Sequence, residues 1–293
     1  MQKICVFCNH KQFGFVSKTV RDSEKHKVIK CKNCGHVQLF PIPTINDDKH
    51  FYDNNLQQKN ISISINLKEI EKKSKADTNR RTELIKKLTP KNGSVLEIGS
   101  GYGFFLEKMR RGGYKAVGIE VSKERRRFAR KITTAEVLDI NLNSTSLDIG
   151  QFNTIVMFHV LEHIANPIQF LKNIRRLLKN NGKLVIEVPN IRDLQLKHND
   201  YYRGWYWQRA HIHYFSPIIL TKILKESGFK KIILQGTQRY SLENMFHWKL
   251  INKPQLENPA YSLSQEYNWL ENSYKKYLEK KLLCDTIIAV CSL

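Results

Sequence analysis

The chain has 293 residues and a formal net charge of +22, which follows from 49 Lys and Arg against 27 Asp and Glu. No apolar run approaches the roughly 20 residues of a membrane span, and the first residues lack the apolar core of a signal peptide, so a cytoplasmic protein is expected. The charge favours anionic partners such as nucleic acid or nucleotide-linked substrates, although basic residues scattered singly are equally typical of solvated faces.

Residues 1–45 are predicted to form a separate zinc ribbon. Cys5-x-x-Cys8 is followed by Cys31-x-x-Cys34, and the two knuckles present four thiolates to one metal ion. This donor set is typical of a structural Zn²⁺ site, and it leaves no open position for catalysis. Because so small a unit has little apolar core, the metal is expected to supply its folding energy.

A linker and a leading helix are predicted over 46–90. The first part is polar and hard to assign. Apolar residues among many charges then predict a helix over 67–88, and Pro90 to Gly93 end it.

Strands and helices alternate from residue 91 to residue 236. This alternation predicts an α/β fold, a doubly wound and largely parallel sheet with ligands at the carboxyl ends of its strands. With a last strand near the C-terminus the sheet is expected to have seven strands, at 94–98, 116–121, 135–138, 154–158, 183–188, 230–234 and 286–290. Helices are expected at 104–111, 123–131, 167–178 and 217–227.

Residues 190–215 interrupt the pattern and are predicted to form a lid on the substrate side. Residues 237–293 are expected to add a C-terminal substrate-side segment and the last strand. The lid carries four aromatic side chains that can stack on apolar or sugar faces, Tyr202, Trp205, Tyr206 and Trp207.

A glycine-rich turn follows the first strand of the alternating region. Gly99, Gly101 and Gly103 let the backbone approach a ligand closely, and Glu120 ends the next strand, where a carboxylate accepts hydrogen bonds from ribose hydroxyls. The Gly-x-Gly-x-Gly spacing is one residue short of the dinucleotide pattern. Glu97 precedes the turn, and its carboxylate suits the ammonium and sulfonium of S-adenosylmethionine better than a pyrophosphate.

Four motifs resemble those of class I S-adenosylmethionine-dependent methyltransferases. They occur in the expected order over about residues 75–235, as Glu97–Gly103, Gly118–Ser122, Phe158–His163 and Lys183–Asn190. The resemblance implies a Rossmann-like methyltransferase fold with S-adenosylmethionine as cofactor. The N-terminal cysteines and the following Phe51-Tyr52 resemble the zinc-ribbon front end of a bacterial subgroup, whose members modify sugars, glycans or other secondary metabolites.

The resemblance also implies roles for individual residues. The turn would line the methionine portion, Glu97 would organise its ammonium, Glu120 would hold the ribose, and Asp139 or Asn141 would contact the adenine. The full set of cofactor candidates is Glu97, Gly99, Ser100, Gly101, Gly103, Glu120, Val121, Asp139, Asn141 and Phe158.

Methyl transfer from a sulfonium is an in-line displacement, and an oxygen or nitrogen nucleophile also loses a proton. Histidine suits this proton transfer near neutral pH. His159 and His163 follow the fourth strand, and His211 and His213 lie in the lid; we expect His159 or His213 to be the general base. A histidine that only holds the loop by a hydrogen bond is an equally good interpretation of each one.

A divalent cation is a further hypothesis. In ubiquinone-biosynthesis O-methyltransferases, which look similar here, acidic residues and a histidine after the fourth strand bind such a cation. Glu162 and His163 match this pattern, but His159 replaces the first acidic ligand.

Three functions compete. The leading hypothesis is methyl transfer to a small-molecule or sugar-containing acceptor, and the alternative is an RNA methyltransferase that uses the zinc ribbon and the basic surface. The third is a non-catalytic scaffold, against which the intact glycine turn and Glu120 argue.

Overall fold

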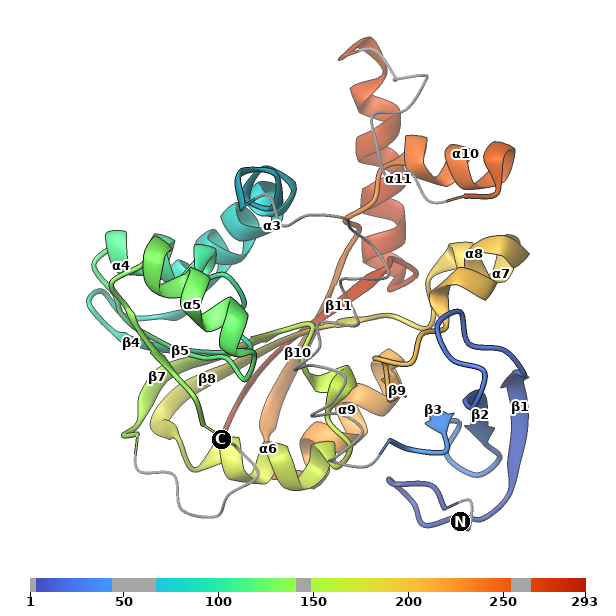
Figure 1. Cartoon of the computed structure of the whole chain (residues 1–293), viewed down its shortest axis with the longest axis horizontal. Helices are drawn as coiled ribbons and strands as arrows, with labels where there is room; N and C mark the ends of the chain where they lie inside the picture. Colours follow the sequence, from blue (N-terminus) through green and yellow to red (C-terminus); the bar gives the residue numbers. More distant parts are fainter. Residues whose placement is uncertain (1–3, 44–66, 141–148, 254–264) are drawn as a thin grey trace.

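The computed structural model describes residues 4–43, 67–140, 149–253 and 265–293, and these form two sheets (Figure 1). The larger sheet has seven strands in the order β10-β11-β8-β7-β4-β5-β6. Only β11 runs antiparallel to its neighbours, so the predicted doubly wound seven-stranded fold is confirmed. The strands are β4 (Ser94–Ile98), β5 (Lys115–Ile119), β6 (Glu136–Leu138), β7 (Phe152–Phe158), β8 (Leu178–Pro189), β10 (Lys230–Thr237) and β11 (Thr286–Ser292).

Helices cover both faces of this sheet (Figure 1). One face carries α3 (Leu67–Leu88), α4 (Phe104–Arg111) and α5 (Lys123–Ile132), and the other carries α6 (Pro167–Arg175) and α9 (Pro217–Glu226). The bounds of α3 confirm the helix that the sequence predicted over 67–88. The helix predicted over 167–178 ends earlier, because Leu178 already pairs with Phe152 as the first residue of β8. The predicted turn at Asn181-Gly182 lies in an irregular part of that strand.

The hydrophobic core has two layers, one on each face of the large sheet, and alternate residues of a strand belong to different layers. Val95 and Val156 pack in the cluster with α3 and α4, whereas Leu96, Ile155 and Met157 pack in the cluster with α6 and α9. Side chains of a strand point to opposite faces in turn, so a strand covered on both faces must be apolar throughout. This is the pattern from which the sequence predicted these strands.

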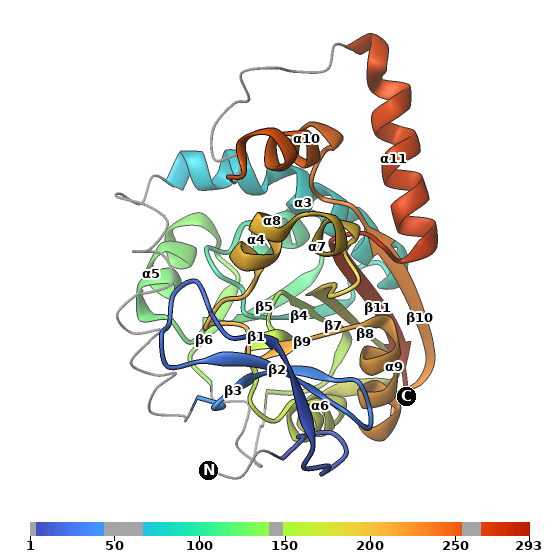
Figure 2. The same ribbon diagram turned by 90° about the vertical axis from the view of Figure 1, so that its right-hand side faces the viewer.

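The smaller sheet joins the N-terminal unit to the lid. Its order is β1 (Phe13–Ser17), β2 (Lys27–Cys31), β3 (Val37–Phe40) and β9 (His213–Tyr214). The pairing of β3 with β9 links residues far apart in the sequence, and Figure 2 shows β1 to β3 beside β9. The sequence had assigned His213 and Tyr214 to an irregular loop.

The segments at the substrate side are short helices. After β7 comes η1 (Leu161–His163), and the lid contains α7 (Leu194–His198) and α8 (Asp200–Tyr206). The C-terminal segment adds α10 (Leu242–Ile251), η2 (Gln265–Tyr267) and α11 (Asn268–Lys281) before β11. Within the described ranges, no helix combines the length and apolarity needed to cross a bilayer.

Candidate active site

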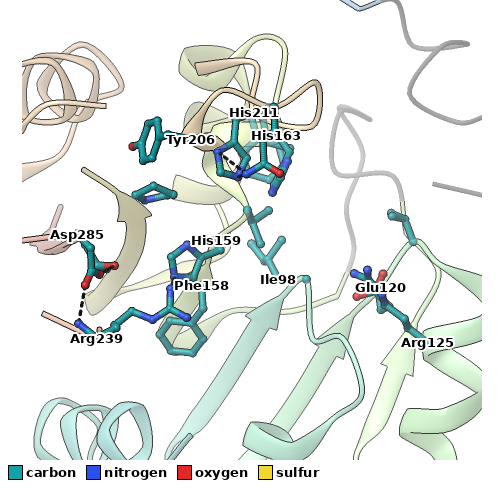
Figure 3. A pocket seen from close by; sticks show the side chains of 18 of the residues that line it. Ile98, Glu120, Arg125, Phe158, His159, His163, Tyr206, His211, Arg239 and Asp285 are labelled. Carbon is teal, nitrogen blue, oxygen red and sulfur yellow. Dashed lines mark hydrogen bonds between the residues drawn. The ribbon is translucent and has the colours of Figure 1, made fainter. Parts of the chain in front are cut away.

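A cavity of about 600 Å³ lies at the carboxyl ends of the parallel strands. This is where a doubly wound sheet binds its ligand. The cavity runs from the end of β5, at Glu120, past Phe158 and His159 to the lid residues Tyr206 and His211 (Figure 3). It therefore joins four of the predicted cofactor residues to the predicted acceptor side, namely Gly99, Glu120, Val121 and Phe158, whereas Glu97, Ser100 and Gly101 do not line it.

The glycine turn after β4 has the backbone shape that the sequence predicted. Gly99 and Gly101 have φ values of +75° and +55°, which favour glycine. A Cβ on Gly99 would lie 2.5 Å from Cγ2 of Val160, whereas one on Gly101 would meet nothing within 4 Å. Gly99 is thus required for packing, and Gly101 leaves open space beside its backbone.

Glu120 is held in place by the turn itself. Its Oε2 accepts a hydrogen bond from the Gly101 N–H at 2.8 Å, and its Oε1 accepts one from the Ser122 N–H at 2.9 Å. The side chain is only 4% exposed but lines the cavity. Each carboxylate oxygen has a second lone pair, so Glu120 can still accept from a ligand hydroxyl.

Glu97 is a buried carboxylate at the same end of β4. Its Oε2 has no hydrogen-bond partner in the described part of the chain. Burial raises its pKa well above the usual value, with Arg81 opposing the shift. A buried carboxylate oxygen without a partner is costly, and an ammonium group supplies what it lacks. The chemistry of Glu97 therefore suits the cationic end of S-adenosylmethionine, although its side chain does not line the cavity.

Other predicted cofactor residues are placed differently. Val121 lines the cavity, but Asp139 is absent from its lining; its side chain is 64% exposed and ion-paired with Arg126. Ile140 lines the cavity next to it, and Asn141 lies outside the described residues. Gly103 caps α4 and packs against Ala129, so its role here is in helix packing.

His159 lies in the cavity wall within a network of charged groups. Its Nε2 is 3.0 Å from Nη1 of Arg239 and 3.2 Å from Oε1 of Glu187, and its Nδ1 is 3.4 Å from Oε1 of Glu162. Burial and the nearby Arg239 disfavour the charged ring, but the adjacent carboxylates of Glu162 and Glu187 outweigh them and raise the pKa of His159. With both nitrogens engaged, His159 is poorly placed to take a proton from an acceptor.

The network extends to helix α3. Glu187, almost fully buried, accepts hydrogen bonds from Arg80 and Arg81 as well as lying beside His159. Arg239 also donates to Asp77 at 2.9 Å. Sequence reasoning missed this network, because its members come from α3, β8 and the C-terminal segment and no local pattern connects them.

A second cluster contains Glu162, His163 and His211. One ligand atom from each lies within 4.8 Å of the others. Neither oxygen of Glu162 has a hydrogen bond in the described structure, although this side chain is fully buried. The Nδ1 of His163 lies 2.6 Å from the carbonyl oxygen of Ala210, which makes Nδ1 the donor and turns Nε2 towards Glu162. Burial lowers the pKa of His211 to about 3, so its ring is neutral.

His213 is turned away from the cavity. It is 1% exposed, its Nδ1 lies 3.1 Å from Nε2 of His36, and its Nε2 lies 3.3 Å from the carbonyl oxygen of Ala165. It does not line the cavity, so the geometry argues against the expectation that it acts as the general base. It occupies the junction between the ribbon sheet and the lid.

Three of the four predicted lid aromatics line the cavity. Tyr202, Trp205 and Tyr206 form one wall, and Trp207 packs edge-on against Tyr214 instead. Tyr202 is fixed by a hydrogen bond from its hydroxyl to Asp193 at 2.7 Å.

The four N-terminal cysteines come together as the sequence predicted. The Sγ atoms of Cys5 and Cys34 are 3.5 Å apart, and those of Cys8 and Cys31 are 3.6 Å apart. All four lie within 4.8 Å of one another. Four thiolates at Zn–S distances of about 2.3 Å in a tetrahedron have sulfur separations of this size, so the donor set fits a zinc ion.

A family model described as a methyltransferase domain matches residues 71–234. The chain belongs to this methyltransferase domain family. The matched region contains the glycine turn, Glu120 and the histidines after β7. The predicted class of enzyme, an S-adenosylmethionine-dependent methyltransferase, is confirmed.

The methyltransferase is similar to ubiquinone biosynthesis O-methyltransferases. It is 25% identical to that of Dinoroseobacter shibae over 167 residues, which cover 51% of this chain and 67% of that protein. It is also 25% identical to that of Coxiella burnetii over 173 residues, covering 54% and 73% of the two chains.

Solved structures share the fold of the methyltransferase. A SAM-dependent methyltransferase from Archaeoglobus fulgidus aligns with a TM-score of 0.53 and 17% identity, covering 75% of this chain and 94% of that one. One from Thermotoga maritima aligns with a TM-score of 0.52 and 17% identity, covering 83% and 98%.

Proposed function

We propose that the protein transfers the methyl group of S-adenosylmethionine to a small-molecule acceptor bound between Phe158 and the aromatic lid. The continuous cavity carries this proposal: one end holds Glu120 and the other is walled by Tyr202, Trp205 and Tyr206. A cavity of several hundred Å³ that combines aromatic walls with polar groups converging on it is typical of a small-molecule site. The resemblance of the ribbon favours sugar-containing or secondary metabolites, and the relatives' names favour a hydroxyl acceptor.

The residues that would hold the cofactor follow from the geometry. Glu120 would accept from the ribose hydroxyls, the backbone at Gly99 would lie against the cofactor, and Glu97 would balance the ammonium. When bound, S-adenosylmethionine supplies an electrophilic methyl group. The chain's contribution is to hold the acceptor in line with that methyl, which accounts for most of the acceleration in such a reaction.

A hydroxyl or amine acceptor loses a proton when it is methylated, so the site needs a group that can accept this proton. His163 and His211 face the cavity, and Nε2 of His163 carries a lone pair because its Nδ1 donates to the carbonyl oxygen of Ala210. We therefore assign proton removal to this pair and not to His159 or His213. The same cluster also fits a divalent cation, because the buried Glu162 carboxylate, which contacts His159 through Oε1, lies close to the ring nitrogens of His163 and His211 as well. Two histidines and one carboxylate form a common cation site with open positions, and a cation bound there would lower the pKa of an acceptor hydroxyl.

A Glu162→Gln variant tests the cation. Mn²⁺ binding, measured by electron paramagnetic resonance on the zinc-loaded protein, is expected to weaken more than about 100-fold, beyond the effect of losing an outer-shell partner. Glu226→Gln on α9, a surface carboxylate near Lys222, serves as the control and should bind Mn²⁺ as the unmodified protein does. Equal Mn²⁺ binding by Glu162→Gln, or none by the unmodified protein, would remove the cation and leave the histidines as the proton acceptors.

We further propose that residues 1–45 form a zinc ribbon held by Cys5, Cys8, Cys31 and Cys34, as in the bacterial subgroup that the sequence resembles. The sulfur separations support this assignment. The ion would supply folding energy and no catalytic chemistry, because four cysteines fill its coordination sphere.

An extract assay with isotopically labelled methyl donor tests the function. We expect label in the small-molecule fraction and none in RNA, because the cavity is walled by the lid and suits a compact ligand. Label in tRNA or rRNA that disappears at high salt would instead support the RNA alternative. Absence of S-adenosylhomocysteine binding by calorimetry would contradict both.

A further inference from the structure

The connection between β1 and β2 reaches from the ribbon to the lid. The backbone N–H of Arg21 donates to the carbonyl oxygen of Trp207 at 3.0 Å, and Oδ1 of Asp22 accepts from the backbone N–H of Arg209 at 2.7 Å. These two hydrogen bonds fix the connection against the lid.

The Arg21 guanidinium touches two residues that line the cavity. Its Cζ lies 4.2 Å from the centre of the Trp205 ring, and its Nη2 donates to Oε1 of Gln208 at 2.9 Å. Arg21 has no ion pair among the described residues, so these two contacts are its specific interactions there. A planar guanidinium can stack on an indole and donate in its own plane at the same time, which a lysine cannot do.

The hydrogen bond from Arg21 decides the orientation of the Gln208 amide. Because Oε1 accepts from the guanidinium, Nε2 must face the other way, and it lies 3.0 Å from Nε2 and 3.2 Å from Nδ1 of His211. An amide N–H donates only to a ring nitrogen with a lone pair. The Gln208 amide therefore holds His211 in a fixed orientation with an unprotonated nitrogen facing it.

We propose that Arg21 of the ribbon is a positioning residue for the acceptor side of the methyltransferase site, orienting His211 through Gln208 and holding the plane of Trp205. This chain of contacts from Arg21 through Gln208 to His211, here called the relay, links the N-terminal unit to the cavity, although no described residue of the ribbon lines the cavity. The importance of His211 rests on the proposed function, but the relay itself is a geometric statement that can be tested without an acceptor.

The test compares Arg21→Ala, Arg21→Lys and Lys25→Ala. Lys25 lies exposed in the same connection, so its loss removes the same charge without touching the lid. The ring nitrogen signals of His211, assigned in ¹⁵N spectra by their loss in His211→Gln, are recorded without added divalent ions. We expect them to move in Arg21→Ala, to return towards their original positions in Arg21→Lys, whose ammonium can still donate to Gln208, and to stay unchanged in Lys25→Ala.

Two further measurements separate positioning from folding and from the proposed function. Calorimetry should find S-adenosylhomocysteine affinity within about twofold in all variants, because the Arg21 side chain contacts Trp205 and Gln208 and not Glu120 or the glycine turn. With the acceptor found by the extract assay, Arg21→Ala should raise KM about tenfold, the effect of one lost hydrogen bond. Unmoved His211 signals in Arg21→Ala would overturn the relay. Moved signals without any methylated acceptor would instead contradict the proposed function and leave the relay intact.

Discussion

Glu120→Ala is expected to weaken S-adenosylmethionine binding by about 100-fold. The carboxylate lies in the cavity with lone pairs left for two ribose hydroxyls, and a hydrogen bond to a charged group is worth about 1.5–3 kcal/mol. In the unmodified protein the Gly101 N–H donates to Oε2 of Glu120, so the variant also removes a hydrogen bond that holds the turn. Isothermal titration with S-adenosylhomocysteine measures the change directly.

Glu136→Ala provides the control for this experiment. Glu136 is an exposed carboxylate on the neighbouring strand β6 and does not line the cavity. The affinity of the Glu136→Ala variant for S-adenosylhomocysteine should match that of the unmodified protein. Glu120→Gln keeps the shape and one acceptor oxygen, so an intermediate affinity is expected. An unchanged affinity in Glu120→Ala would mean that the ribose is held elsewhere.

Cys31→Ser is expected to release the metal and unfold the N-terminal unit. A structural zinc contributes about 10–16 kcal/mol to the folding of small zinc units, far more than the few buried side chains of this ribbon can replace. Because β3 pairs with β9 and Val28 and Leu39 pack in the same cluster as Tyr206 and Trp207, the lid should loosen with it. Metal analysis and hydrogen exchange of residues 199–215 report the two effects.

Cys284→Ser separates this effect from cysteine loss in general. Cys284 is fully buried far along the chain, and its Sγ donates to the carbonyl oxygen of Thr286, a bond that a serine hydroxyl can keep. This variant should retain one zinc per chain and normal exchange in the lid. Full zinc content in Cys31→Ser would contradict the four-cysteine site, and normal lid exchange in a zinc-free variant would show that the lid does not depend on the ribbon.

The sequence alone determined the elements whose signals are local. Val95 and Leu96 are both apolar because both faces of the sheet are covered, and this run can be recognised in the sequence. Gly99 directly after the run predicts a tight turn, where the structure shows that Val160 leaves no space for a Cβ. The two Cys-x-x-Cys pairs predicted the thiolate cluster because the spacing within each pair is a local signal that by itself indicates a metal-binding knuckle. The enzyme class followed from motifs that each lie within a few residues.

The tertiary structure decided which of the candidate histidines meet the cavity. Among four candidate histidines the sequence favoured His159 or His213 as the general base, but His213 pairs with His36 in the ribbon junction, and His159 lies between two buried carboxylates. His211 joins Glu162 and His163 only because the lid folds back over η1. Such contacts depend on how segments far apart in the chain pack, and a local pattern of residue types carries no record of that packing. The relay from Arg21 to His211 is of the same kind, because it spans two units that the sequence had predicted separately.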